Sequence, residues 1–168
     1  MQFACGYKCA AIWAKEEAKK KDYLEKIDDK YNGRKPKTES LSQQHALTQT
    51  SFNLWVREVK EKDAVECISC KRTRGAWAEH AGHFKSVGSA GILRYEPDNV
   101  WLQCLECNVH KSGNVAEYRK NLVEKIGLER VEWLEARAGK VYKWKIAELK
   151  DLRFKINKAI RESGYGSD

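Results

Sequence analysis

The residues best suited to chemistry in this sequence are its cysteines, which stand in pairs. The pairs are Cys5 and Cys9, Cys67 and Cys70, and Cys104 and Cys107. The second and third pairs have C-x-x-C spacing, which lets each pair direct two thiolates at one metal ion, so that together they complete a four-thiolate zinc site. A redox-active pair or buried free thiols are the alternatives, but the repeated spacing favours structural zinc.

Histidines and asparagines lie between the two C-x-x-C pairs and directly after the second one. His80 and His83 follow the first pair, Asn99 precedes the second pair, and Asn108 comes immediately after Cys107. A zinc ion that joins the two pairs would hold this short segment in place where there is little apolar material to form a core. The pattern therefore predicts a small metal-stabilised unit that presents imidazole and amide groups.

The same order of residues resembles the HNH, or ββα-metal, nucleases, in which two strands and a helix carry a catalytic metal. The resemblance implies that His83 is the general base, that Asn99 orients it across the hairpin, and that Asn108 binds a catalytic Mg²⁺ or Mn²⁺ ion. A neutral imidazole can take a proton from water because histidine titrates at about pH 6.5. Many HNH enzymes have a metal-binding aspartate where this chain has Gly82, so the first metal ligand is open. The nearby candidates for that ligand are His80 and Glu79, and His80 could equally be an ordinary surface histidine.

A longer stretch of the chain, roughly residues 52–135, resembles the bacteriophage NinG (Rap) recombination nucleases. The resemblance rests on short strings at matching places, which are Cys67–Cys70, Ala81–Phe84, Leu93–Tyr95, Gln103–Asn108 and His110–Asn114. It implies cutting of branched recombination intermediates, such as Holliday junctions and D-loops, by a phage protein in the cytoplasm of the bacterial host. Symmetric cutting of a four-way junction would suit a homodimer. Such proteins tend to carry an N-terminal cysteine-rich finger, of which Cys5 and Cys9 would be a vestige or an incomplete part. Two ordinary buried thiols are the alternative.

Two other functions stay open at this point. One is an HNH enzyme of the nicking or restriction type that prefers a DNA sequence. The other is a catalytically inactive zinc module that binds DNA, which the glycine at position 82 would suit. Nicking of branched against linear DNA in the presence of a divalent ion separates all three.

The elements that must position these residues are placed by hydrophobic periodicity and turn signals. Helices are expected over residues 10–31, 51–62, 107–126, 128–138 and 145–162, and strand-like segments over 76–84 and 100–102. Residues 32–49 are polar and are expected to form a linker. Gly127 and Gly139 follow two of the expected helices, at the position where glycine commonly ends a helix.

Net charge separates the flanks from the middle of the chain. The 168 residues carry a formal charge of +8, with +3 in residues 1–50, a balanced segment 51–107 and +5 in residues 108–168. Basic flanks favour a polyanionic partner such as DNA, and solvated helix faces are the plain alternative. The candidate DNA contacts are Lys111, Arg119, Lys150, Lys155 and Lys158. No apolar run approaches the roughly 20 residues of a membrane helix.

These features predict an α+β protein of three parts. Residues 1–50 form a charged helical arm with the partial cysteine motif and a linker, residues 51–127 form a zinc-clipped HNH core, and residues 128–168 form basic helices. The length suits one domain with a modest core, since 42% of the residues are hydrophobic. The HNH geometry of that core follows from the resemblance, whereas the zinc site follows from the cysteine spacing.

Overall fold

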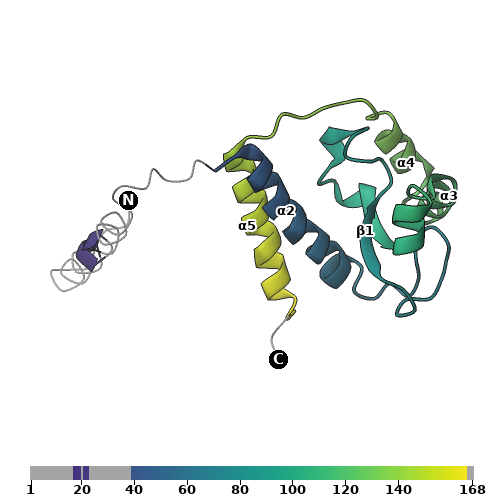
Figure 1. The fold of residues 1–168 in the computed structure, drawn as a ribbon, viewed down its shortest axis with the longest axis horizontal. Helices are drawn as coiled ribbons and strands as arrows, with labels where there is room; N and C mark the ends of the chain where they lie inside the picture. Colours follow the sequence, from purple (N-terminus) through teal and green to yellow (C-terminus); the bar gives the residue numbers. More distant parts are fainter. Residues whose placement is uncertain (1–16, 20, 23–38, 166–168) are drawn as a thin grey trace. The chain divides into compact units, whose positions relative to one another are not determined.

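The computed structural model describes residues 17–19, 21–22 and 39–165 (Figure 1). The chain divides into two compact units, Met1–Glu39 and Ser40–Asp168. Residues 17–19 and 21–22 are helical, and the rest of the helix expected over residues 10–31 lies outside the described residues, as do Cys5 and Cys9. The second unit carries the other candidate residues.

The centre of the second unit is a two-stranded antiparallel sheet. Strand β1 spans Glu79–His83 and strand β2 spans Val100–Cys104, and the register places His80 opposite Gln103. Both strands lie where strand-like segments are expected. Because successive side chains of a strand point to opposite faces, His80 and His83 lie on opposite faces of the sheet.

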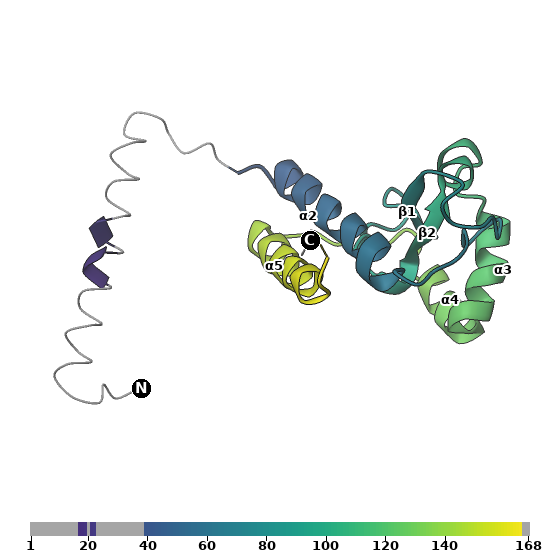
Figure 2. The same ribbon diagram turned by 90° about the horizontal axis from the view of Figure 1, so that it is seen from below.

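Helices cover both faces of this sheet. Helices α3 (Val115–Ile126) and α4 (Leu128–Glu135) lie on one side of it, and α2 (Leu41–Trp55) and α5 (Ile146–Glu162) lie side by side on the other (Figures 1 and 2). The α3–α4 side is filled by an apolar cluster that includes Phe84, Trp101, Tyr118, Leu122, Val131 and Leu134. The α2–α5 side is filled by a second cluster that includes Phe52, Val56, Tyr95, Val100, Leu149 and Ile156. The fold is therefore α+β, with a small sheet between two helical layers.

Helix α2 begins ten residues before the helix expected over residues 51–62, within the segment expected to be a linker. Ser40 caps it, because its Oγ accepts from the N–H of Gln43 (3.2 Å) while the Gln43 side-chain oxygen accepts from the N–H of Ser40 (3.1 Å). The buried positions of the first half of α2 are polar, namely Gln44 and Thr48. Polar residues on a buried face hide the helical period from a hydrophobicity pattern, so the linker interpretation is wrong for this part of the chain.

The helix expected over residues 107–126 is interrupted. A π-helical turn, η4, spans Glu106–His110, and α3 begins five residues after it ends. The residues directly before α3 have positive φ angles of 49°, 89° and 44°, and are Ser112, Gly113 and Asn114. A left-handed backbone cannot continue a right-handed helix, which explains the break.

The remaining predictions of secondary structure agree with the structure at their centres. Helix α5 matches the helix expected over residues 145–162, and α4 ends three residues earlier than expected. Gly127, with a φ angle of 84°, ends α3 as expected, whereas Gly139, with a φ angle of 78°, lies in the turn after α4 and not at its end. Two short 3₁₀ turns, η2 (Gly91–Leu93) and η3 (Pro97–Asn99), lie between the strands. Among the described residues, no helix combines the length and apolar character needed to cross a bilayer.

Candidate metal centre and active site

The cysteines of the two C-x-x-C pairs come together in the structure. Cys67 and Cys70 lie in a turn, Cys104 is the last residue of β2, and Cys107 lies in η4. Their four sulfur atoms lie within 4.8 Å of one another, and the Sγ atoms of Cys70 and Cys104 are 3.7 Å apart. Four sulfurs at about 2.3 Å from one zinc ion would be roughly 3.8 Å apart in a tetrahedron. The geometry is therefore compatible with the structural zinc site that the spacing predicts.

The surroundings of these thiols show why they would need a cation. Burial raises the pKa of the Cys67 thiol and raises that of Cys107 to about 12. Two backbone groups contact the sulfur atoms, since the N–H of Cys104 donates to Cys67 Sγ and the N–H of Cys107 donates to Cys104 Sγ, both at 3.4 Å. At Cys70 burial is outweighed by hydrogen bonds from the backbone of Arg72 and from the other cysteines, and the pKa is lowered. A divalent ion would stabilise the buried negative charge at Cys67 and Cys107.

The structure brings His80 and Asn108 together beside the cysteines. His80 lies on β1 and Asn108 lies in η4, and His80 Nδ1 is 3.3 Å from Asn108 Nδ2. Both side chains are half-buried. A half-turn of the amide exchanges its nitrogen for its oxygen, so the pair can present an imidazole nitrogen and an amide oxygen to one cation. Helical turns of the π type recur at functional sites, which fits the position of Asn108.

Gly82, between the two histidines, is required by close packing. A Cβ at this position would collide with the side chain of Gln103. Gln103 is fully buried, and its Nε2 donates to Gly113 O (2.6 Å) and Ser69 Oγ (2.7 Å). The hydroxyl of Tyr118 donates to the carbonyl of Gly82 (2.9 Å). An aspartate at position 82 would therefore require Gln103 to move, and the residue of β1 that reaches Asn108 in this chain is His80.

His83 lies on the other face of the sheet. Its Nε2 is 2.9 Å from the carbonyl oxygen of Arg94, and because a carbonyl can only accept, Nε2 carries the proton and Nδ1 is left as the acceptor. Burial lowers the pKa of His83, so the ring is neutral at pH 7. The tautomer and charge suit a base, but the structure does not bring His83 to Asn108. Three residues of a strand span about 10 Å and change the face, which separates His83 from His80.

Asn99 bonds across the hairpin to backbone groups and not to the ring of His83. It is fully buried, its Oδ1 accepts from the N–H of Lys85 (2.8 Å), and its Nδ2 donates to the carbonyls of Lys85 (3.0 Å) and Leu93 (3.1 Å). Leu93 directly precedes the residue whose carbonyl accepts from His83. Asn99 therefore positions His83 through the backbone of the loop.

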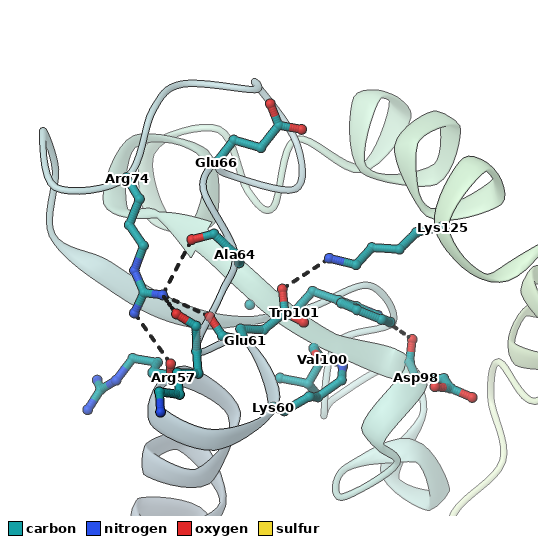
Figure 3. Close-up of polar contacts among 12 residues, drawn as sticks. Arg57, Lys60, Glu61, Ala64, Glu66, Arg74, Asp98, Val100, Trp101 and Lys125 are labelled. Atoms are coloured by element: carbon teal, nitrogen blue, oxygen red, sulfur yellow. Dashed lines mark hydrogen bonds and ion pairs between the residues drawn. The ribbon is translucent and has the colours of Figure 1, made fainter. Parts of the chain in front are cut away.

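Lys60, which no sequence pattern singles out, holds the turn that carries Asn99. Figure 3 shows Lys60 beside Val100 and Trp101. Lys60 ends the π-helical turn η1 (Val56–Lys60), and its Nζ donates to the carbonyls of Pro97 and Val100, both at 2.6 Å. The same nitrogen lies 3.2 Å from the centroid of the Trp101 ring. Burial lowers the pKa of Lys60 to about 7. Its partners lie some 40 residues away in the chain, so a local pattern cannot distinguish it from solvated lysines.

Arg74 joins the start of β1 to the end of η1. Figure 3 shows its contacts with Arg57, Glu61 and Ala64 around the end of η1. The Arg74 guanidinium donates to both carboxylate oxygens of Glu79 at 2.8 Å and to the carbonyls of Glu61 (2.8 Å) and Lys62 (2.9 Å). The Arg74 guanidinium lowers the pKa of the Glu79 carboxyl group, so Glu79 stays ionised. Glu79 is thereby engaged in structure and is not available as a metal ligand beside His80.

The residues predicted to contact DNA lie at the surface but differ in their partners. Arg119 forms two hydrogen bonds of 3.0 Å with Glu135, which tie α3 to α4. Three of the lysines form exposed pairs, which are Lys111 with Glu106 (3.9 Å), Lys155 with Asp151 (2.7 Å) and Lys158 with Glu162 (3.6 Å). Lys150 is exposed. Exposed pairs of this kind contribute little free energy, so the lysines can exchange them for phosphate, whereas Arg119 has a structural partner.

Comparison with known proteins identifies the family. The family model described as Bacteriophage Lambda NinG protein matches residues 1–164. Over 115 residues, or 68% of this chain, the sequence is 33% identical to the protein ninG of Escherichia phage 933W and 34% identical to those of Escherichia phage lambda and Salmonella phage P22. The matched part is 55% of the first relative and 54% of the other two, so the chain spans about half the length of the curated relatives it matches. No solved structure matches it. On this similarity the chain belongs to the family of the bacteriophage lambda NinG protein.

Proposed function

We propose that this chain is a metal-dependent, structure-specific DNA endonuclease that cuts branched recombination intermediates such as Holliday junctions and D-loops. Its core would be an HNH, or ββα-metal, unit made by β1, β2 and η4. The observation that carries the proposal is the contact of 3.3 Å between His80 and Asn108, next to the four-cysteine cluster. Two potential ligands from distant parts of the sequence thus meet at one place.

In this proposal His80 and Asn108 hold the catalytic divalent ion. Asparagine is a neutral ligand, which suits a hard ion that also binds water and a substrate phosphate. When bound, Mg²⁺ or Mn²⁺ supplies neutralisation of the scissile phosphate and of the departing 3′-oxygen. The cysteine cluster would hold η4, and with it Asn108, against β1.

His83 is the general base in this proposal. Its Nε2–H is engaged by the carbonyl of Arg94, which leaves Nδ1 to take the proton of the attacking water. Burial keeps the ring neutral by lowering its pKa. His83 and His80 lie on opposite faces of β1, so substitutions of the two residues test the base and the metal ligand separately.

The experiment compares nicking of a four-way junction with nicking of linear duplex of the same sequence, with and without Mg²⁺ or Mn²⁺. We expect metal-dependent nicking that prefers the junction. His80→Ala and Asn108→Ala should raise the concentration of divalent ion needed for half-maximal cutting, because each removes a ligand. His83→Ala should bind the junction normally and cut it at least about 100-fold more slowly, as expected for loss of a general base. His110→Ala, an exposed histidine in the same turn as Asn108, is the matched control.

Each other result points to a different function. Binding without nicking would identify an inactive DNA-binding module, and equal cutting of both substrates at one sequence would identify a sequence-preferring enzyme. If His83→Ala cuts normally while His80→Ala is inactive, the base is on the other face of β1 and the role given to His83 is wrong.

A further inference from the structure

The turn between η4 and α3 has an unusual backbone that points to a function for Asn114. Three successive residues, Ser112, Gly113 and Asn114, have positive φ. Non-glycine residues rarely adopt this conformation and keep it where their surroundings enforce it. Two backbone bonds close the turn, from Gly113 N–H to the carbonyl of Cys107 and from Asn114 N–H to the carbonyl of Lys111, both at 2.8 Å. The chain is thus folded back onto one of the four cysteines.

The side chain of Asn114 does not act as its position predicts. Asn114 is the N-cap residue of α3, where an asparagine oxygen usually accepts from a backbone N–H of the first helical turn. It makes no such bond. Instead its Nδ2 lies 3.5 Å from Cys107 Sγ and donates to it. The amide that could cap the helix is directed at a sulfur of the metal cluster.

Helix α3 is also tied to the other cysteine pair and to β1. Asn121 Nδ2 donates to the carbonyls of Ile68 (2.7 Å) and Ser69 (3.0 Å), which lie between Cys67 and Cys70. The Tyr118 hydroxyl, from the same helix, donates to a carbonyl of β1. One helix therefore contacts both halves of the cysteine cluster and the strand that carries His80.

We infer that Asn114 is an outer-shell donor to the metal centre, which stabilises the Cys107 thiolate and anchors the start of α3 to it. Four thiolates around one divalent cation leave a net charge of −2, so an N–H dipole aimed at a sulfur opposes both protonation and loss of that ligand. The inference concerns the cysteine cluster and does not depend on the proposed nuclease activity.

The competing explanation is that Asn114 is present for its backbone alone, since asparagine tolerates positive φ. Asn114→Gly separates the two, because glycine adopts this conformation more easily but has no amide to donate. Asn114→Asp keeps the size of the side chain and replaces the donor by a carboxylate, which would face the thiolate. Ser112→Gly is the matched control, because it relaxes a neighbouring positive φ and leaves the amide of Asn114 in place.

The test loads the full chain with Co²⁺ and follows sulfur-to-cobalt charge-transfer absorption while an excess of chelator removes the metal. We expect Asn114→Gly to lower the affinity for Co²⁺ by about 10- to 100-fold, as outer-shell substitutions typically do, and Asn114→Asp to lower it further. Ser112→Gly should match the wild type. Wild-type affinity in Asn114→Gly would overturn the inference in favour of the backbone explanation. Absence of the charge-transfer band from the wild-type protein would overturn it together with the metal centre.

Discussion

The second unit has an apolar end, which is the α2–α5 side, and a cysteine end around Cys67, Cys70, Cys104 and Cys107. The two ends are held together by different forces. On the α2–α5 side, Phe52, Val56 and Leu149 are buried in an apolar cluster. At the cysteine end, the buried residues of the cluster are cysteines, with Trp77 packed against them. His80 and Asn108 lie at this second end, so their positions depend on polar bonds and on the four-cysteine cluster. We therefore expect the geometry of this pair to depend on metal, and the packing of α2 against α5 to be independent of it.

Loss of the cysteine cluster should have the largest effect. Binding of structural zinc contributes on the order of 10–16 kcal/mol in small peptides, which is as large as the whole stability of a small domain. Cys67→Ser or Cys104→Ser should therefore unfold residues 65–127 and abolish any nicking. Metal content and circular dichroism of the purified protein measure this. Far less than one zinc ion per wild-type chain would refute the prediction.

Damage to the apolar end should lower stability but leave the metal in place. Phe52 is 2% exposed and packs against the rings of Trp55 and Tyr95. Phe52→Ala should cost about 3–5 kcal/mol in the free energy of unfolding, measured by denaturant titration, at unchanged zinc content. The control is Phe154→Ala on α5, where the ring is 64% exposed and the expected change is within about 0.5 kcal/mol. If Phe52→Ala lost zinc as well as stability, the metal site would depend on the packing of the α2–α5 side.

Acidification should lower the stability of the folded protein through His83, which lies on the α2–α5 side of the sheet. Burial lowers the pKa of His83 below its usual 6.5, so as the pH falls below 6.5 the unfolded chain binds a proton that the folded protein resists. The stability present above pH 6.5 is therefore lost on acidification, and denaturant midpoints measured at several pH values should show a smaller loss for His83→Gln. Burial also lowers the pKa of His45, so His45→Gln should separately reduce the loss of stability on acidification. An unchanged pH dependence in both variants would contradict the assignment.

The smallest effect is expected at the outer surface of α5. Neutralising Lys150, Lys155 and Lys158 should reduce the slope of log affinity for duplex DNA against log salt concentration, by about 0.9 for each phosphate that the helix no longer neutralises. Lys120→Gln, an exposed lysine on α3, serves as the control. A slope that does not change would mean that this face of α5 does not lie on DNA.

Local signals in the sequence were sufficient for several parts of the molecule. The repeated C-x-x-C spacing predicted the four-cysteine cluster, and the apolar stripe that includes Leu149, Ile156 and Ile160 predicted α5. Gly127 marked the end of α3, whereas α4 ends at Glu135, four residues before Gly139. In each case the information lies within a few residues, or in a residue type with few alternative uses.

Other features were decided by contacts between distant residues. Helix α2 starts at Leu41 because a capping box forms and polar residues find buried partners, as Thr48 does when it donates to the carbonyl of Leu149 (3.2 Å). Gly82 is required by Gln103 on the neighbouring strand. The pairing of His80, and not His83, with Asn108 follows from the strand register. Side chains three residues apart on a strand point to opposite faces, and which face meets η4 depends on how helices and sheet pack, which spacing along the chain does not encode.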